Sequence, residues 1–180
     1  MASDGQRRWY SEPLAYPGRV FIFGGGHVSQ ALVPVLVSIG FSCTVVDDRA
    51  EFADPALFPQ AEAVYEADYE ALPADLGVTP DDYVCIMTRG HVGDYDVQRQ
   101  MLAIKPYYLG VIGSRRKLAF VKEKLLADGF TAAEIDACHA PIGLAISAVT
   151  PAEIAISIAA ELIAIRAKRE GREKSRYHKP

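Results

Sequence analysis

Short apolar runs alternate along most of the chain with segments of helical periodicity. The runs that we predict as strands are 20–23, 44–47, 63–65, 83–87 and 107–112. The segments whose apolar residues recur every three or four positions, which we predict as helices, are 27–39, 69–76, 95–104 and 115–127. Strands that alternate with helices in this way are typical of βαβ units around a parallel sheet.

The expected strands are apolar at consecutive positions, as in Val20–Phe23 (VFIF) and Tyr83–Met87 (YVCIM). They lack the alternation of apolar and polar residues that marks a half-exposed antiparallel sheet, so we expect them to be buried on both faces. The sequence therefore predicts an α/β fold, a three-layer, doubly wound Rossmann-type parallel sheet with helices on both faces.

Two further helices are predicted after residue 130. Thr131 and Glu134 form a capping-box pattern at the start of 131–137, and Thr150 followed by Pro151 marks the start of 150–167. The last helix carries a broad apolar stripe that can cover the sheet and supply a homodimer contact, made of Ile154, Ile156, Ile158, Leu162, Ile163 and Ile165. In the first helix, Pro34 is expected to kink or interrupt the backbone near Gln30.

The length of 180 residues fits one domain. We predict a linker or N-terminal arm over 1–18, a Rossmann-type domain over 19–167 and a basic, flexible tail over 168–180. From Arg166 onward there are seven Lys or Arg against two Glu, although the whole chain has a net charge of −4. Cations at the end of a helix are favoured by its free carbonyls, so we interpret the tail as a solvated helix end and do not expect nucleic-acid binding.

Composition narrows the class of protein. No apolar run approaches the ~20 residues of a membrane span, and the N-terminus lacks the apolar core of a secretory signal, so we expect a cytoplasmic protein with no membrane partner. The three cysteines, Cys43, Cys85 and Cys138, are far apart and have no metal-ligand or redox-pair spacing. We therefore predict reduced thiols and no metal site.

The turn after the first predicted strand is rich in glycine and opens the first predicted helix. Gly24 and Gly26 occupy the first two places of a G-x-G-x-x-G pattern, and Ser29 takes the third. In that context the first glycine allows a tight turn and the second lets a pyrophosphate approach the positive end of the helix. The residues predicted to bind a phosphate here are Gly24, Gly25, Gly26, His27, Val28 and Ser29.

A carboxylate pair follows the second predicted strand. Asp47 and Asp48 lie close to the offset of about 20 residues at which a carboxylate hydrogen-bonds a ribose in dinucleotide-binding folds. Arg49 comes next and could instead meet a 2′-phosphate, so NAD and NADP are both open as ligands.

Two more turns at expected strand ends are cationic. Ligands of doubly wound sheets bind outside the carboxyl ends of the strands, and guanidinium groups match phosphate or carboxylate oxygens there. We add to the predicted binding site Thr88, Arg89, Gly90, His91, Gly113, Ser114, Arg115 and Arg116.

The sequence shows no legible catalytic constellation. His27 and His91 could bond a ligand, act as acid or base, or merely cap a helix. Neither serine of the two glycine-containing turns lies in a nucleophile elbow. Catalytic residues are therefore unassigned, and the pattern leans away from an enzyme.

Together, GGGHVS at 24–29, VDDR at 46–49, TRGH at 88–91, GVIGSRRK at 110–117 and PIGL at 141–144 resemble the C-terminal Rossmann domain of the XdhC/CoxI family over about residues 17–167. The resemblance implies a role in maturation of molybdenum hydroxylases such as xanthine dehydrogenase. It further implies the molybdenum cofactor (molybdopterin) as ligand, and the apoenzyme and a cysteine desulfurase as partners.

The family's usual N-terminal domain has no counterpart here, so the chain is expected to be a stand-alone short relative or a fragment. A separate chain that supplies this N-terminal domain is one of the partners that the resemblance leaves open. Two alternatives stay open beside a cofactor-maturation chaperone. One is an NAD(P)-dependent oxidoreductase, in which His27 or His91 relays a proton. The other is a nucleotide-sensing regulatory module.

Overall fold

A five-stranded, all-parallel sheet forms the centre of the protein. The structure, a computed structural model, describes residues 2–3, 8–9, 18–90 and 92–172. The strands are β3 (Arg19–Phe23), β4 (Ser42–Asp47), β5 (Ala63–Glu66), β6 (Tyr83–Ile86) and β7 (Tyr108–Val111). Their spatial order is β5-β4-β3-β6-β7, with β3 in the middle. This arrangement confirms the predicted parallel α/β fold.

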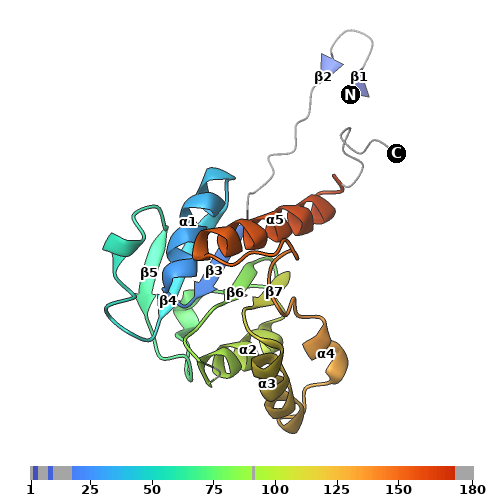
Figure 1. Cartoon of the computed structure of the whole chain (residues 1–180). Helices are drawn as coiled ribbons and strands as arrows, with labels where there is room; N and C mark the ends of the chain where they lie inside the picture. Colours follow the sequence, from blue (N-terminus) through green and yellow to red (C-terminus); the bar gives the residue numbers. More distant parts are fainter. Residues whose placement is uncertain (1, 4–7, 10–17, 91, 173–180) are drawn as a thin grey trace.

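Helices cover both faces of the sheet (Figure 1). The helix α1 (His27–Ser38) and the long C-terminal helix α5 (Pro151–Arg169) lie on one face. The helices α2 (Val92–Ile104) and α3 (Arg115–Ala127) lie on the other, with the short α4 (Ala132–Asp136) beside them. Two 3-10 turns, η1 (Pro55–Leu57) and η2 (Ala74–Leu76), complete the elements of the domain.

Alternate residues of each central strand enter different cores. In β3, Val20 and Ile22 pack with α1 and α5, whereas Phe21 and Phe23 pack with α2 and α3. All four are at most 2% exposed. Burial on both faces explains why the sequence is continuously apolar here. The edge strand β5 differs from the expectation, because it has only one neighbour and its Tyr65 is 44% exposed.

The helix expected over 69–76 does not form. Only Ala74–Leu76 turns, as the 3-10 element η2. Pro73 cannot donate a helical hydrogen bond, and the side chain of Gln100 satisfies both the Leu72 amide and the Tyr69 carbonyl. The side chain of Tyr69 is buried and its hydroxyl donates to the Val46 carbonyl at 3.2 Å, so this segment is packed as core without a helix.

Pro34 does not interrupt the first helix, because α1 continues to Ser38. The alternative expectation, a kink near Gln30, stays a prediction. Pro34 is exposed on the outer side of the helix. There water can reach the Gln30 carbonyl that lacks a partner amide.

The capping box predicted at Thr131 and the helix start predicted at Thr150 are confirmed, and Thr150 forms a capping box as well. The Thr131 hydroxyl accepts from the Glu134 amide at the start of α4, and Thr150 does the same for Glu153 at the start of α5. Each glutamate side chain in turn accepts from the backbone of its threonine.

The predicted linker and tail lie mostly outside the described residues. Within residues 1–18, Ala2–Ser3 (β1) and Arg8–Trp9 (β2) pair as two short antiparallel strands. In the predicted tail, α5 extends to Arg169 and the description ends at residue 172. Among the described residues, no helix combines the length and the apolar character that a bilayer crossing requires.

Candidate functional site

The carboxyl ends of β3 and β6 flank the point at which the order of the sheet reverses. The chain runs from β3 outward to β4 and β5, then crosses back to β6 and β7 on the other side. Open α/β sheets bind their ligands at such a switch point. The glycine turn leaves β3 here and Met87–Thr88 leave β6 beside it. We call the surface between these two turns the crevice, and the predicted site residues begin there.

The first two glycines of the turn are required by packing. Gly24 has φ +112°, and a Cβ built on it would lie 2.2 Å from the Met87 carbonyl oxygen. A Cβ on Gly25 would lie 2.2 Å from the Phe52 carbonyl oxygen. The backbone of the turn is thus pressed between the segments that follow β4 and β6.

Gly26 is different, because a Cβ at that position would meet no atom within 4 Å. Gly26 is the N-cap of α1, with φ −70° and ψ −176°, an extended conformation that any residue can adopt. Neither packing nor backbone conformation among the described residues requires glycine here. The open space lies at the positive end of a 12-residue helix whose first turn contains no acidic residue.

Polar side chains of α1 hold the glycine turn in place by hydrogen bonds to its carbonyl groups. The buried Ser29 hydroxyl donates to the Gly24 carbonyl, and Gln30 Nε2 donates to the Gly25 carbonyl at 3.0 Å. Val28 packs against the core, so that only its backbone can serve a ligand, whereas His27 is exposed.

Asp47 at the end of β4 is buried, and both of its carboxylate oxygens accept hydrogen bonds from within the protein. Its Oδ2 accepts from the Gly25 amide at 2.7 Å and from Arg49 Nη2 at 3.1 Å. Its Oδ1 accepts from the Arg49 amide at 3.0 Å and from Arg49 Nε at 2.9 Å. Although burial acts to raise the pKa of Asp47, the bonds from Arg49 and Gly25 outweigh it and lower the pKa. The carboxylate therefore braces the glycine turn.

The Arg49 side chain is held within the protein, whereas the Asp48 side chain is exposed to solvent. The Arg49 guanidinium is bound to Asp47 and stacks on Phe52 with its Cζ 3.7 Å from the ring centroid. The Asp48 side chain is 41% exposed, and partial burial together with the nearby Asp47 raises its pKa. A ribose contact for Asp47 and an anion contact for Arg49 stay predictions, and Asp48 is the carboxylate that faces solvent.

A third network joins the ends of β6 and β7. The Asp94 carboxylate is completely buried and accepts from the Thr88 amide at 3.1 Å and the Thr88 hydroxyl at 2.5 Å. Its other oxygen is ion-paired with the Lys117 ammonium. Burial raises the pKa of Asp94, and the bonds from Lys117 and Thr88 oppose that shift.

The remaining predicted residues lie on the turns beside this network. Arg89, Arg115 and Arg116 are exposed, and their side chains have no ion-pair or hydrogen-bond partner in the part of the chain that the structure describes. Ser114 caps α3 by accepting from the Lys117 amide at 3.4 Å. Gly90 has φ +83° and open space around it. His91 lies outside the described residues.

Sequence reasoning missed Lys117 as a site residue. Its position in the run GSRRK was visible, but its partner Asp94 lies 23 positions earlier on another helix. A buried aspartate cannot be distinguished from an exposed one without the fold.

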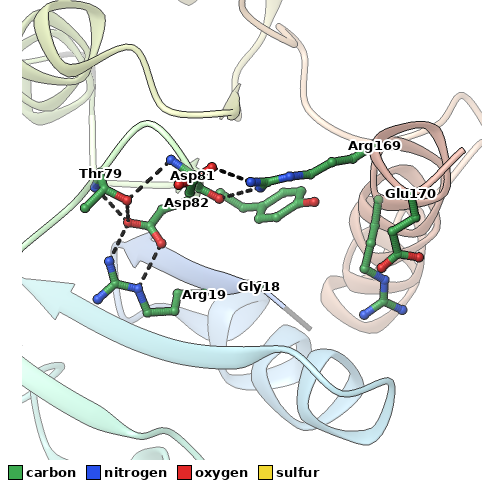
Figure 2. Close-up of a pocket in the computed structure, with 9 residues that line it drawn as sticks. Gly18, Arg19, Thr79, Asp81, Asp82, Arg169 and Glu170 are labelled. Carbon is green, nitrogen blue, oxygen red and sulfur yellow. Dashed lines mark hydrogen bonds and ion pairs between the residues drawn. The ribbon is translucent and has the colours of Figure 1, made fainter. Parts of the chain in front are cut away.

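A separate cavity of about 520 Å³ lies at the opposite, amino-terminal edge of the sheet and shares no residue with the glycine turn. Figure 2 shows that two of its arginines, Arg19 and Arg169, are bound by acidic side chains of the same cavity. Arg19 binds both carboxylate oxygens of Asp82 at 2.9 and 2.7 Å, and Arg169 pairs with Asp81. Arg166 also lines the cavity, and its buried Nε has no hydrogen-bond partner among the described residues. Because Arg19 and Arg169 are neutralised by Asp82 and Asp81, this cavity is a weaker candidate for an anion site than the crevice.

The described residues contain no group of three or more His, Cys, Asp or Glu side chains that could hold a metal ion. The thiols of Cys43 and Cys85 are buried, and burial raises the pKa of both. The cysteines therefore offer no reactive thiolate at the crevice.

The strand order, the glycine turn at the switch point and the capped helices define a Rossmann-type domain. Residues 20–162 match the family model described as the XdhC Rossmann domain. Since that match covers most of the chain, the protein belongs to the XdhC Rossmann-domain family.

The chain is also similar to curated proteins and to a solved structure. The chain is 32% identical to the uncharacterized protein YqeB of Escherichia coli K12 over 82% of its own length and 27% of that protein. It is 28% identical to a probable xanthine dehydrogenase subunit of Bacillus subtilis 168, covering 82% of this chain and 43% of that one. It matches the crystal structure of a xanthine dehydrogenase from Bacillus halodurans with a TM-score of 0.70 and 31% identity, over 89% of this chain and 45% of that chain. The chain thus spans less than half the length of each of these proteins.

Proposed function

We propose that the crevice at the carboxyl ends of β3 and β6 binds the phosphate groups of a nucleotide or molybdopterin-type ligand. The observation that carries the proposal is the open space at Gly26. A glycine that neither packing nor conformation requires, at the amino end of a helix, is explained by the close approach of a ligand phosphate.

Charge supports the same location. Arg115 and Arg116 occupy the first turn of α3, where the helix dipole is unfavourable for cations, and neither side chain is neutralised by a described residue. Arg89 lies on the neighbouring turn. A bound anion would relieve this excess of positive charge. In our proposal the 24–29 backbone holds phosphate and the arginines hold further oxygens. Asp48 meets a ribose, because the neighbouring Asp47 is buried and already accepts hydrogen bonds from Gly25 and Arg49.

The two proposed ligand classes share the group that the crevice fits. NAD(P) and other dinucleotides present a pyrophosphate, and molybdopterin carries a phosphate that the same amides can bind. For molybdopterin, the chain would hold cargo rather than a resident catalyst. The described residues fit its phosphate end, and they offer no ligand cluster for the metal itself.

We further propose that the chain acts as an accessory protein in maturation of a molybdenum hydroxylase of the xanthine dehydrogenase type, in the cytoplasm. Family membership and the xanthine dehydrogenase names of two similar proteins support this role. The proposed partners are the hydroxylase apoenzyme, a cysteine desulfurase and a separate N-terminal XdhC/CoxI-type domain.

Small molecules that copurify with the native protein test the ligand proposal. Native mass spectrometry of the wild type is expected to show a phosphate-bearing adduct, and Gly26→Val should lose it because its branched side chain fills the open space. Ala31→Val on the same helix serves as the matched control for a β-branched addition. A Gly26→Val protein that folds and retains the adduct would contradict the assignment.

Cells that lack the gene test the accessory role. Xanthine dehydrogenase activity and its molybdenum content should both fall on deletion, and the wild-type gene should restore them while Gly26→Val does not. Unchanged activity on deletion would contradict the role. Sustained nicotinamide reduction by the purified chain with an alcohol or acid would instead support the oxidoreductase alternative.

A further inference from the structure

The turns after β6 and β7 are connected through one buried carboxylate. Asp94, in the first turn of α2, holds the Lys117 ammonium of α3 on one oxygen and the amide and hydroxyl of Thr88 on the other. A Cβ on Gly24 would lie 3.1 Å from the Cα of Thr88, so this network directly adjoins the glycine turn.

Two glycines make room for the network. A Cβ on Gly93 would lie 2.9 Å from the Thr88 hydroxyl oxygen, and one on Gly113 would lie 3.1 Å from Lys117 Cδ. The stem of Lys117 therefore folds back over the start of the β7–α3 turn. This arrangement carries its ammonium from α3 toward β6 and the switch point.

Lys117 retains capacity for a ligand. An ammonium has three donors, and the contact with Asp94 occupies one of them among the described residues. The Lys117 side chain is 21% exposed, whereas Asp94 is sealed from solvent. A buried carboxylate that anchors a partly exposed ammonium fixes the position of that ammonium, as a surface ion pair would not.

We propose that the half of the crevice over β6 and β7 is a subsite for an anionic group, with Lys117 as a contact residue and Asp94 as its positioning residue. This inference rests on the proposed function, and it specifies that the second half of the ligand is negatively charged. A dinucleotide spans the switch point from the β3–β4 side to the β6 side. The second half of the ligand would then lie beside Lys117, Arg115 and Arg116, which suits a carboxylate or other oxyanion and disfavours the cationic ring of NAD⁺.

Two sugar nucleotides that differ at one group test the charge. UDP-glucuronate carries a carboxylate where UDP-glucose carries a hydroxymethyl group, and both share the diphosphate. In titration calorimetry at low salt, UDP-glucuronate is expected to bind at least about tenfold more tightly, because a charge-assisted hydrogen bond is replaced by a neutral contact in UDP-glucose. The difference should shrink as salt is added.

Variants assign the preference to Lys117. Lys117→Met should remove most of it, Lys117→Arg should restore part of it, and Asp94→Asn should weaken it by releasing the ammonium. Because Lys117→Met leaves a buried charge unpaired, the double variant with Asp94→Asn is measured as well, and thermal unfolding checks the fold of each. Lys122→Met is the matched control, since that lysine is on the same helix but pairs with Asp136.

NAD⁺ and NADH give a second matched pair with an adenine base, and NADH, whose ring is neutral, should bind more tightly to the wild type. Equal affinities within both pairs, or a preference that Lys117→Met leaves intact, would overturn the anionic subsite while the phosphate site stands. If none of the four nucleotides binds, the proposed phosphate site fails and the subsite fails with it.

Discussion

Glycine occupies the three consecutive positions of the first turn for different physical reasons. Gly24 combines φ +112° with a close approach to the Met87 carbonyl, whereas Gly26 has an ordinary conformation and open surroundings. Gly24 is therefore explained by folding, and Gly26 is explained by what approaches it in our proposal.

Alanine at these two positions should separate stability from binding. Gly24→Ala is expected to destabilise the fold by about 2 kcal/mol or more, because strained backbone and a clash with a carbonyl add. The free energy of unfolding of Gly26→Ala should lie within about 0.5 kcal/mol of the wild-type value, as is usual for surface substitutions. Urea unfolding followed by circular dichroism measures both. Equal losses at the two positions would contradict this distinction.

Asp47 should make stability depend on pH in a definite direction. Its pKa is lowered in the folded state, so the stability that it contributes is present above the unfolded pKa of about 3.9 and is lost as the pH falls through the lower folded value. Asp47→Asn should therefore cost about 2 kcal/mol at pH 7, since it loses charged hydrogen bonds to Arg49 and Gly25.

Urea titrations of wild type and Asp47→Asn, at neutral pH and at successively lower pH below the unfolded pKa, check this linkage. The gap between the two proteins should narrow toward acid, and the exposed Asp75→Asn should show no comparable gap. A gap that stays constant with pH would mean that the carboxylate charge is not what stabilises the turn.

At the scale of elements, the sequence predicted what local chemistry determines. The strands could be predicted because burial on both faces leaves continuous apolar runs. The start of α4 could be predicted from its capping box and the start of α5 from Thr150 and Pro151, because both are local signals. The segment 69–76 has helical spacing too, yet it forms no α-helix, because the side chain of Gln100 bonds its backbone and its apolar residues pack in the core. That outcome depends on a partner about 30 positions away.

The same limit applies to the site. The glycine turn was predictable because its spacing is local, whereas the use of every Asp47 lone pair within the protein and the Asp94–Lys117 pair arise only when distant turns meet.

The capping box of α5 should contribute measurably to stability. Thr150→Ala removes the acceptor of the Glu153 amide and should cost about 1 kcal/mol in the free energy of unfolding. Thr150→Ser is the conservative control, and it should retain most of the stability because it keeps the hydroxyl. Thermal denaturation followed by circular dichroism measures the change, and an unaltered midpoint in Thr150→Ala would contradict the role of the cap.

At the scale of the whole molecule, α5 leaves an apolar surface uncovered. Ile158 and Leu162 are buried against the domain, but Ile156 and Ile163 are 52% and 40% exposed and lie seven residues apart on one side of the helix. Leu144, Ile146 and Val149 are also exposed in the segment before α5. The homodimer contact expected for this helix stays a prediction, and we expect it to be formed by these exposed apolar residues.

Sedimentation velocity tests that contact. The wild type is expected to sediment as a dimer, and Ile156→Glu combined with Ile163→Glu should yield a folded monomer, because each buries a charge at the proposed interface. Leu126→Glu, at another exposed apolar position, should leave the dimer intact. A monomeric wild type would contradict the prediction.

Backbone amide chemical shifts during a titration with ADP show whether phosphate binds at the glycine turn. The amides of Gly25, Gly26 and His27, at the start of α1, should shift first and furthest, and Gly26→Val should abolish these shifts. Shifts confined to Gly18, Asp81 and Arg169 around the amino-terminal cavity, or no saturable shifts in the glycine turn, would contradict binding at this turn.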